Sequence, residues 1–127
     1  MEREIKFRGK RVDNVDNGKW VYGYYHKECS GAVFIAEEAN LDVYKRQMVR
    51  AVDAETVGQF IGLTDRNGKE IYEGDKVKCR LCRFDMVGYV VFQNSCFQLK
   101  YETMYLCLIG LGAVEIVGNI HDNPELI

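Results

Sequence analysis

The chain has 127 residues, of which 47% are hydrophobic and 28% are charged, and its formal net charge is -2. This composition is typical of a folded globular protein and excludes collagen-like, low-complexity and acidic disordered chains. The small net charge excludes a general attraction to polyanions, so contact with nucleic acid would need a local basic surface. The length predicts one domain over residues 1–127.

The start of the chain and its cysteines predict a cytoplasmic protein. Residues 1–10 are charged at almost every other position and lack the apolar run of a signal peptide. The longest apolar stretch, residues 105–114, is about half of the roughly 20 residues that cross a bilayer, so we expect no membrane contact. The five cysteines are an odd number, which predicts free and mostly buried thiols rather than a disulfide framework.

The first part of the chain has the pattern of short β-strands. Apolar and charged residues alternate over residues 5–10, which predicts a strand with one buried and one wet face. A turn over residues 13–18 leads into a second strand at residues 20–25, and together they predict a hairpin. A third short strand is predicted at residues 33–36.

The next part contains the one predicted helical turn. Residues 37–47 fit either a helical turn or a long loop, and residues 48–52 predict another strand. Asp53 is predicted to cap a single helical turn at residues 54–56, because its side chain can accept hydrogen bonds from the exposed N–H groups that follow.

A second hairpin is predicted in the middle of the chain. Residues 57–63 are apolar and punctuated by glycine, and the turn over residues 65–68 leads into a strand at residues 70–72. From Lys76 onward the alternation is strict, with Val77, Cys79 and Leu81 on one side and Lys78 and Arg80 on the other. This segment is predicted to be a half-buried strand.

The last part of the chain adds three strands. Residues 89–93 and 96–101 flank Asn94-Ser95 as a further hairpin, and residues 115–120 form the final strand. Short strands at this spacing, without long crossover helices, predict a mainly β chain that forms a small antiparallel barrel or roll. We expect at most one or two short helices.

Three blocks at the beginning, middle and end of the chain carry a family resemblance. They read IKFRGK with GKWVYGY at residues 5–10 and 18–24, ETVGQFIGL with DRNGKEIYEGD at residues 55–63 and 65–75, and VGNIHDNPEL at residues 117–126. The chain therefore resembles the YopX-like family of bacteriophage and prophage proteins. The resemblance implies an SH3-like barrel with extra strands, the cytoplasm of a bacterial host, and no established activity or assigned site residue.

The three blocks also have a structural interpretation. Large residues in them suit the interior of a barrel, namely Trp20, Tyr22, Tyr24 and Tyr72. A second interpretation is a basic surface for nucleic acid, in which Trp20, Tyr24 and Tyr25 stack on bases. Its cations would come from two stripes, Lys6, Arg8 and Lys10, and Lys76, Lys78 and Arg80. Equally, alternating Lys and Arg are typical of the wet face of any strand.

Metal binding and catalysis have weaker candidates. Cys79-x-x-Cys82 has the spacing of zinc ligands, and His26-x-x-Cys29 could complete a set of four, but a strong zinc signature has two CxxC pairs. We therefore expect no metal and no cofactor. His26 and Cys29 are also the nearest approach to a nucleophile and a base, and residues three apart on a strand point to opposite faces, so we expect no enzyme.

The sequence leads to a ranked set of functions. The first is a phage-encoded, non-catalytic accessory protein that binds a protein partner. The alternatives are a nucleic-acid-binding β-barrel that uses the basic strand faces, and a small module stabilised by zinc. A homo-oligomer would also be consistent with the apolar stretch over residues 105–114, which is long for one small barrel to bury.

Overall fold

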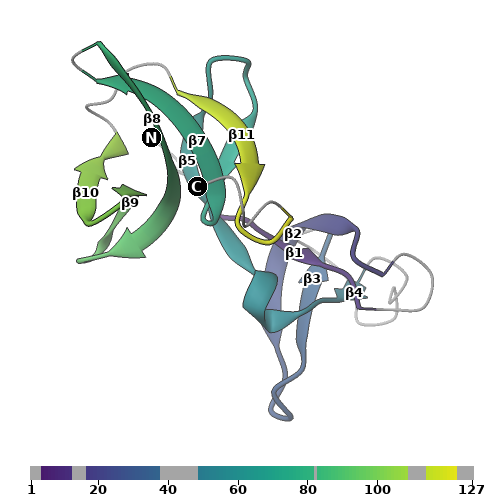
Figure 1. Ribbon diagram of the computed structural model, residues 1–127. Coiled ribbons are helices and arrows are strands. Elements are labelled where there is room, and N and C mark those ends of the chain that lie inside the picture. Colours follow the sequence, from purple (N-terminus) through teal and green to yellow (C-terminus); the bar gives the residue numbers. More distant parts are fainter. Residues whose placement is uncertain (1–3, 13–16, 38–48, 82, 109–113, 123–127) are drawn as a thin grey trace. The chain divides into compact units, whose positions relative to one another are not determined.

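The computed structural model describes residues 4–12, 17–37, 49–81, 83–108 and 114–122, and it is built mainly from β-strands (Figure 1). The chain divides into two compact units, Met1–Phe60 and Ile61–Ile127. The single-domain expectation for residues 1–127 stays a prediction.

The first unit is an antiparallel sheet in the order β4-β3-β2-β1-β5. Its strands are β1 (Phe7–Lys10), β2 (Trp20–Lys27), β3 (Val33–Ala36), β4 (Val49–Ala51) and the start of β5 (Gly58–Thr64). The predicted hairpin is confirmed, because β1 and β2 pair from Phe7 opposite Gly23 to Lys10 opposite Trp20. One face of this sheet carries the core: Val21, Val33, Ile35 and Val52, with Phe7 and Val57 packed against it.

A short 3-10 turn, η2 (Ala54–Thr56), precedes β5 and is hydrogen-bonded to β1. The predicted cap is confirmed, since Asp53 accepts a hydrogen bond from the Glu55 N–H at 3.0 Å. The Thr56 hydroxyl accepts from the Lys10 N–H at 2.9 Å and donates to the Asp53 carbonyl at 2.7 Å. A short capped turn thus satisfies its own end groups and part of the neighbouring strand.

The second unit begins with the end of β5 and holds a five-stranded antiparallel sheet in the order β10-β9-β8-β7-β11. The sheet consists of β7 (Asp75–Leu81), β8 (Phe84–Gln93), β9 (Cys96–Tyr101), β10 (Met104–Cys107) and β11 (Glu115–Asn119), whereas β6 (Glu70–Tyr72) pairs with β5. The core is one cluster of buried residues: Ile71, Val77, Cys79, Met86, Val90, Leu99, Leu108 and Val114. Alternation along β7 and β8 places four of them, Val77, Cys79, Met86 and Val90, on one face of the sheet.

The predicted turn at Asn94-Ser95 is confirmed as the connection between β8 and β9. Both residues have positive φ, 54° for Asn94 and 65° for Ser95, which suits a two-residue hairpin whose twist matches its strands. At the edge of the sheet, β11 shifts register against β7 between Ile116 and Gly118, so Val117 forms a β-bulge.

The mainly β, antiparallel prediction is confirmed, with no α-helix among the described residues. The closed barrel is not found there: β10 and β11 lie at opposite edges of an open sheet instead of pairing with each other. Two features were not predicted, namely the strand β10 and the start of β8 before Tyr89. No helix in the described ranges could span a membrane.

Candidate functional site

The first predicted basic stripe lies on aromatic rings. The guanidinium carbon of Arg8 is 4.5 Å from the centroid of the Trp20 ring, and the Lys10 Nζ is 5.5 Å from the same centroid. Arg8 is buried, so the expectation that this whole stripe is a wet face is wrong. The reason is cross-strand register, which sets Arg8 opposite Tyr22 and Lys10 opposite Trp20. A cation held over an aromatic face is stabilised by about 0.5–2 kcal/mol.

Lys6, the remaining cation of this stripe, lies just before β1. Its Nζ is 5.3 Å from the centroid of the Phe60 ring and 3.4 Å from the Glu4 carboxylate. The Glu4 side chain is more than half exposed, so the ion pair contributes little to the stability of the fold. The contact with the Phe60 ring is therefore the more important one for Lys6.

The strand β2 presents tyrosines to solvent. Tyr22, Tyr24 and Tyr25 are 47%, 37% and 43% exposed. Of the four large residues expected in an interior, Tyr72 is buried, Trp20 is partly buried, and Tyr22 and Tyr24 are exposed. Among the described residues, the buried core of the first unit lies on the opposite face of the sheet, which leaves Tyr22 and Tyr24 in contact with solvent.

Strand alternation sorts these rings between the two faces of the sheet. Trp20, Tyr22, Tyr24 and His26 share one face of β2, and Phe34 of β3 lies beside His26, with ring centroids 6.5 Å apart. We call these five residues the outer aromatic face. Tyr25 lies on the core side, where its ring centroid is 5.4 Å from that of Phe7.

Gly23 holds β2 and β3 together in this region. Its φ is 156°, and a Cβ there would overlap the carbonyl oxygen of Ala36. The hairpin closes at its far end with a hydrogen bond from the Glu28 N–H to the Ala32 carbonyl at 2.9 Å. The spacing of the rings on the outer aromatic face therefore depends on a close backbone approach that only glycine permits.

The second predicted stripe contains both exposed and buried residues. Lys78 and Arg80 are exposed as expected, and Cys79 is buried on the opposite face with Val77. Lys76 is completely buried, so the expectation of a wet face is wrong at that position. The side chain of Leu81 lies outside the described residues.

The two exposed residues of this stripe, Lys78 and Arg80, lie opposite carboxylates. Strand register sets Lys78 opposite Glu115 on β11 and Arg80 opposite Asp85 on β8. Opposite charges across a strand pair attract, and each pair contributes a few tenths of a kcal/mol to about 1 kcal/mol. The two stripes belong to different units, and the structure assigns them different neighbours.

A pocket of about 210 Å³ opens beside this half-stripe. It is lined by Arg66, Lys78, Cys79, Arg80, Asp85 and Glu115. Two of its cations, Lys78 and Arg80, were predicted from the sequence, whereas Arg66, Asp85 and Glu115 were not. The predicted turn over residues 65–68 was the available signal for Arg66, whereas the two carboxylates reach the pocket only through strand pairing.

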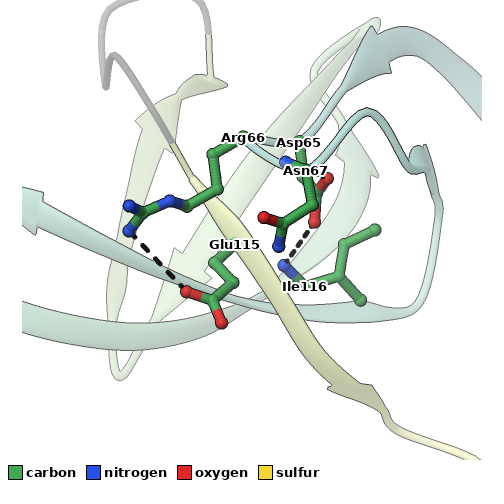
Figure 2. Close-up of polar contacts among 5 residues, drawn as sticks. All are labelled: Asp65, Arg66, Asn67, Glu115 and Ile116. Atoms are coloured by element: carbon green, nitrogen blue, oxygen red, sulfur yellow. Dashed lines mark hydrogen bonds and ion pairs between the residues drawn. The ribbon is translucent and has the colours of Figure 1, made fainter.

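The turn that carries Arg66 is anchored by the buried carboxylate of Asp65 (Figure 2). Its Oδ1 accepts from the N–H groups of Asn67 and Lys69, both at 2.9 Å, and its Oδ2 accepts from the Ile116 N–H at 3.1 Å. Burial by itself would raise the pKa of Asp65, but these backbone donors, helped by the Lys69 charge, hold it below its ordinary value.

Arg66 lies over the first residues of β11. Its backbone N–H donates to the Val114 carbonyl at 2.9 Å, and its Nη1 is 3.8 Å from the Glu115 Oε2 (Figure 2). One anchored turn therefore fixes the backbone of Arg66 against β11 while its side chain stays 63% exposed.

Another lysine of the second unit is flanked by tyrosines. The Lys100 Nζ is 5.7 Å from the Tyr89 ring centroid and 5.8 Å from that of Tyr105. A hydrogen bond with Tyr89, together with the Tyr105 phenol, raises the pKa of Lys100 above its ordinary value. Lys100 therefore remains a cation at neutral pH.

The candidate zinc ligands gain no support from the described residues, among which no group of three or more His, Cys, Asp or Glu side chains could hold a metal ion. His26 lies beside Phe34, and Cys29 is exposed. Cys79 is buried, and burial raises the pKa of its thiol, which disfavours the thiolate that zinc binds. Cys82 lies outside the described residues.

Comparison with known proteins places this fold in a family. The model of the family described as "YopX protein" matches residues 6–127, which run through both units. No curated protein matches the sequence. Among solved structures, protein EF1440 from Enterococcus faecalis is similar, with a TM-score of 0.60 and 18% sequence identity over 98% of this chain and 99% of that chain. That likeness concerns the fold alone, whereas the family match spans nearly the whole sequence, and the chain therefore belongs to the YopX family.

Proposed function

We propose that this YopX-family protein is a non-catalytic binding module that docks on a protein partner through the outer aromatic face of β2 and β3. A phage or prophage origin, with action in the cytoplasm of a bacterial host, is part of the same proposal. The observation that carries it is the exposure of large rings on one strand, 47% for Tyr22 and 37% for Tyr24.

The physical reason lies in what tyrosine and tryptophan do at interfaces. Each offers a large contact area with few rotatable bonds, so little conformational entropy is lost when a partner binds. Tyr, Trp and Arg are also the residues that most often dominate interface energetics. Here Arg8 is already stacked 4.5 Å from the Trp20 ring, which organises this part of the face before binding.

A nucleic-acid partner is the second candidate, because cations and aromatic rings occur together beside β1. Single strands bind to surfaces where bases stack on rings and phosphates meet lysine or arginine. The protein partner is favoured because the exposed groups are phenol rings, whereas Arg8 is buried against Trp20. Phosphate contacts need cations that solvent can reach.

The test is affinity capture from a lysate of the bacterial host, using the wild-type protein and a Tyr22→Ser/Tyr24→Ser variant. We expect a discrete protein that the wild type retains and the variant loses by at least about tenfold, since two interface rings contribute a few kcal/mol. Phe84→Ser is the matched control, because Phe84 is 73% exposed and lies on β8 in the second unit.

The same experiment separates the alternatives. Capture that disappears after nuclease treatment, or that falls steeply between about 50 and 200 mM salt, would replace the protein partner with nucleic acid. Capture of a second copy of the chain, checked by light scattering of the purified protein, would make the outer aromatic face a self-association surface. Equal capture by both variants and the wild type would refute a role for this face.

A further inference from the structure

The pocket on the second unit combines three cations in a small space. Arg66, Lys78 and Arg80 line it together with two carboxylates, Asp85 and Glu115, so its side chains carry a net charge of one positive unit. At about 210 Å³ it is smaller than the 300–1,000 Å³ typical of pockets for drug-sized ligands. Its size suits a single small group with negative charge.

One carboxylate of the pocket, Glu115, holds its cation Arg66 only loosely. The Arg66 Nη1 and the Glu115 Oε2 are 3.8 Å apart, and the two side chains are 63% and 42% exposed. An exposed pair at that distance contributes at most about 1 kcal/mol. A ligand that accepts two parallel hydrogen bonds from a guanidinium group forms a stronger contact and can displace such a carboxylate.

The backbone around the pocket is fixed by hydrogen bonds and strand pairing. The Asp65 Oδ2 accepts from the Ile116 N–H and so fixes the turn that carries Arg66 (Figure 2). The Arg66 N–H itself donates to the Val114 carbonyl at 2.9 Å. Lys78 and Arg80 lie two residues apart on the same face of β7, which pairs with β8 on one side and β11 on the other. Three cations that project from a fixed frame need little reorganisation to meet a ligand.

We propose that this pocket binds a phosphate group, with Arg66 and Arg80 as guanidinium partners and Lys78 as a third cation. A phosphate group carries up to two negative charges and has oxygens on all sides, so it can meet three cations at once, whereas a carboxylate presents two oxygens in one plane. The chemistry is the same whether the phosphate is free or forms the end of a larger molecule. The site lies within the second unit and does not depend on the function proposed for the outer aromatic face.

The first measurement is a titration of the ¹⁵N-labelled full chain with inorganic phosphate, followed by NMR at constant ionic strength. We expect saturable shifts of the backbone amides of Arg66, Lys78 and Arg80, and no such shifts with sodium chloride. Shifts that rise linearly without saturation, or that spread evenly over exposed lysines of both units, would overturn the proposal.

Charge variants should then change the affinity for phosphate in opposite directions, which a loss of structure would not do. Arg80→Gln and Lys78→Gln should each weaken phosphate binding about tenfold, because each removes a charge-assisted hydrogen bond. Glu115→Gln should tighten it about threefold, because it removes the carboxylate that competes for Arg66. Lys27→Gln, on β2 of the first unit, is the control and should change nothing. Equal affinities in all four variants would refute the assignment.

A last comparison identifies the source of the phosphate. A 5′-phosphorylated dithymidine that binds at least about tenfold more tightly than inorganic phosphate, while its unphosphorylated form fails to bind, would assign the pocket to a phosphorylated nucleic-acid end. Equal affinity for both phosphates would assign it to free phosphate or a small phosphomonoester. Phosphate binding that survives in the Tyr22→Ser/Tyr24→Ser variant would keep this proposal separate from the fate of the proposed function.

Discussion

The two basic stripes of this protein have similar sequences and different surroundings. On β1, Arg8 and Lys10 lie over the Trp20 ring. On β7, Lys78 and Arg80 lie opposite Glu115 and Asp85 of the neighbouring strands. In the first unit the cations are stabilised by packing and have lost much of their access to solvent. In the second unit Lys78 and Arg80 stay exposed and are opposed by other charges, whereas Lys76 is buried. Cross-strand register, more than the stripe itself, determines what an alternating run of lysine and arginine can bind.

The largest expected effect on the free energy of unfolding comes from removing the hydrogen bonds of Asp65, which fix the turn beside the second stripe. Asp65→Ala removes the acceptor for three backbone N–H groups, at Asn67, Lys69 and Ile116, and should lower the free energy of unfolding by about 4 kcal/mol. Urea denaturation measures this. Glu55→Ala is the control for the loss of an exposed carboxylate, and a comparable loss there would contradict the role of Asp65 as an anchor.

The same carboxylate predicts a pH dependence. Because its folded pKa lies below the ordinary 3.8, Asp65 stabilises the fold above about pH 4, and this contribution is lost as the pH falls through the lowered value. Wild-type protein should therefore lose stability between about pH 4 and pH 2 more steeply than Asp65→Asn, which cannot ionise there. Parallel curves of unfolding free energy against pH would rule out the low pKa.

The next effect tests the sheet beneath the outer aromatic face. Gly23→Ala places a methyl group against the Ala36 carbonyl and should destabilise the first unit by about 3 kcal/mol, with loss of the amide protection of β3 in hydrogen exchange. Gly31→Ala is matched to it in the same hairpin: its φ is 94° and the surrounding space is open, so only backbone strain of about 1 kcal/mol applies. Similar losses in the two variants would show that strain alone matters.

Removing the ring beneath the first stripe should have a smaller effect. Trp20→Leu keeps an apolar side chain and deletes the surface on which Arg8 and Lys10 lie, so we expect a loss of about 2 kcal/mol. Chemical denaturation with urea at low and high salt measures it. The loss should change little with salt, because Arg8 is buried, and a strong salt dependence would mean that solvent-exposed charge dominates this stripe as well.

The smallest effect belongs to the charged pairs of the second stripe. Glu115→Gln breaks an exposed pair with Arg66 at 3.8 Å and should change the unfolding free energy by less than about 1 kcal/mol. The difference should vanish at about 1 M salt, where charges are screened within a few ångströms. A salt-independent loss above about 2 kcal/mol would show that Glu115 is structural, and the contrast between the two stripes would fail.

Local features could be predicted from the sequence. The Asp53 cap, the Asn94-Ser95 turn and the strand β3 (Val33–Ala36) each depend on residues within a few positions of one another. Turn and cap residues act through their own backbone, so their effect is visible in the sequence. The same reason explains why the hairpin of β1 and β2 was found.

Features that depend on distant pairing could not be predicted in this way. Glu115 reaches Lys78 only because β11 pairs with β7, and β10 was missed because its residues, Met104–Cys107, are mostly exposed at a sheet edge. Alternation assigned Lys76 to a wet face, and its burial depends on tertiary packing that alternation does not contain. The sequence therefore located two cations of the candidate pocket and none of their partners.

The bulge at Val117 has a consequence for how this protein behaves at high concentration. β11 is an edge strand, and a regular edge presents evenly spaced backbone groups on which another extended chain could add. At its start the Ile116 N–H and the Val114 carbonyl are bonded to the turn at Asp65 and Arg66, so the bulge protects the part of the edge that follows Ile116. The register shift between Ile116 and Gly118 interrupts that spacing and twists the strand. Growth of the sheet from one molecule to the next is thereby hindered at this edge. A chain that lacked Val117 would restore the regular spacing and should form aggregates at concentrations at which the wild type stays dispersed.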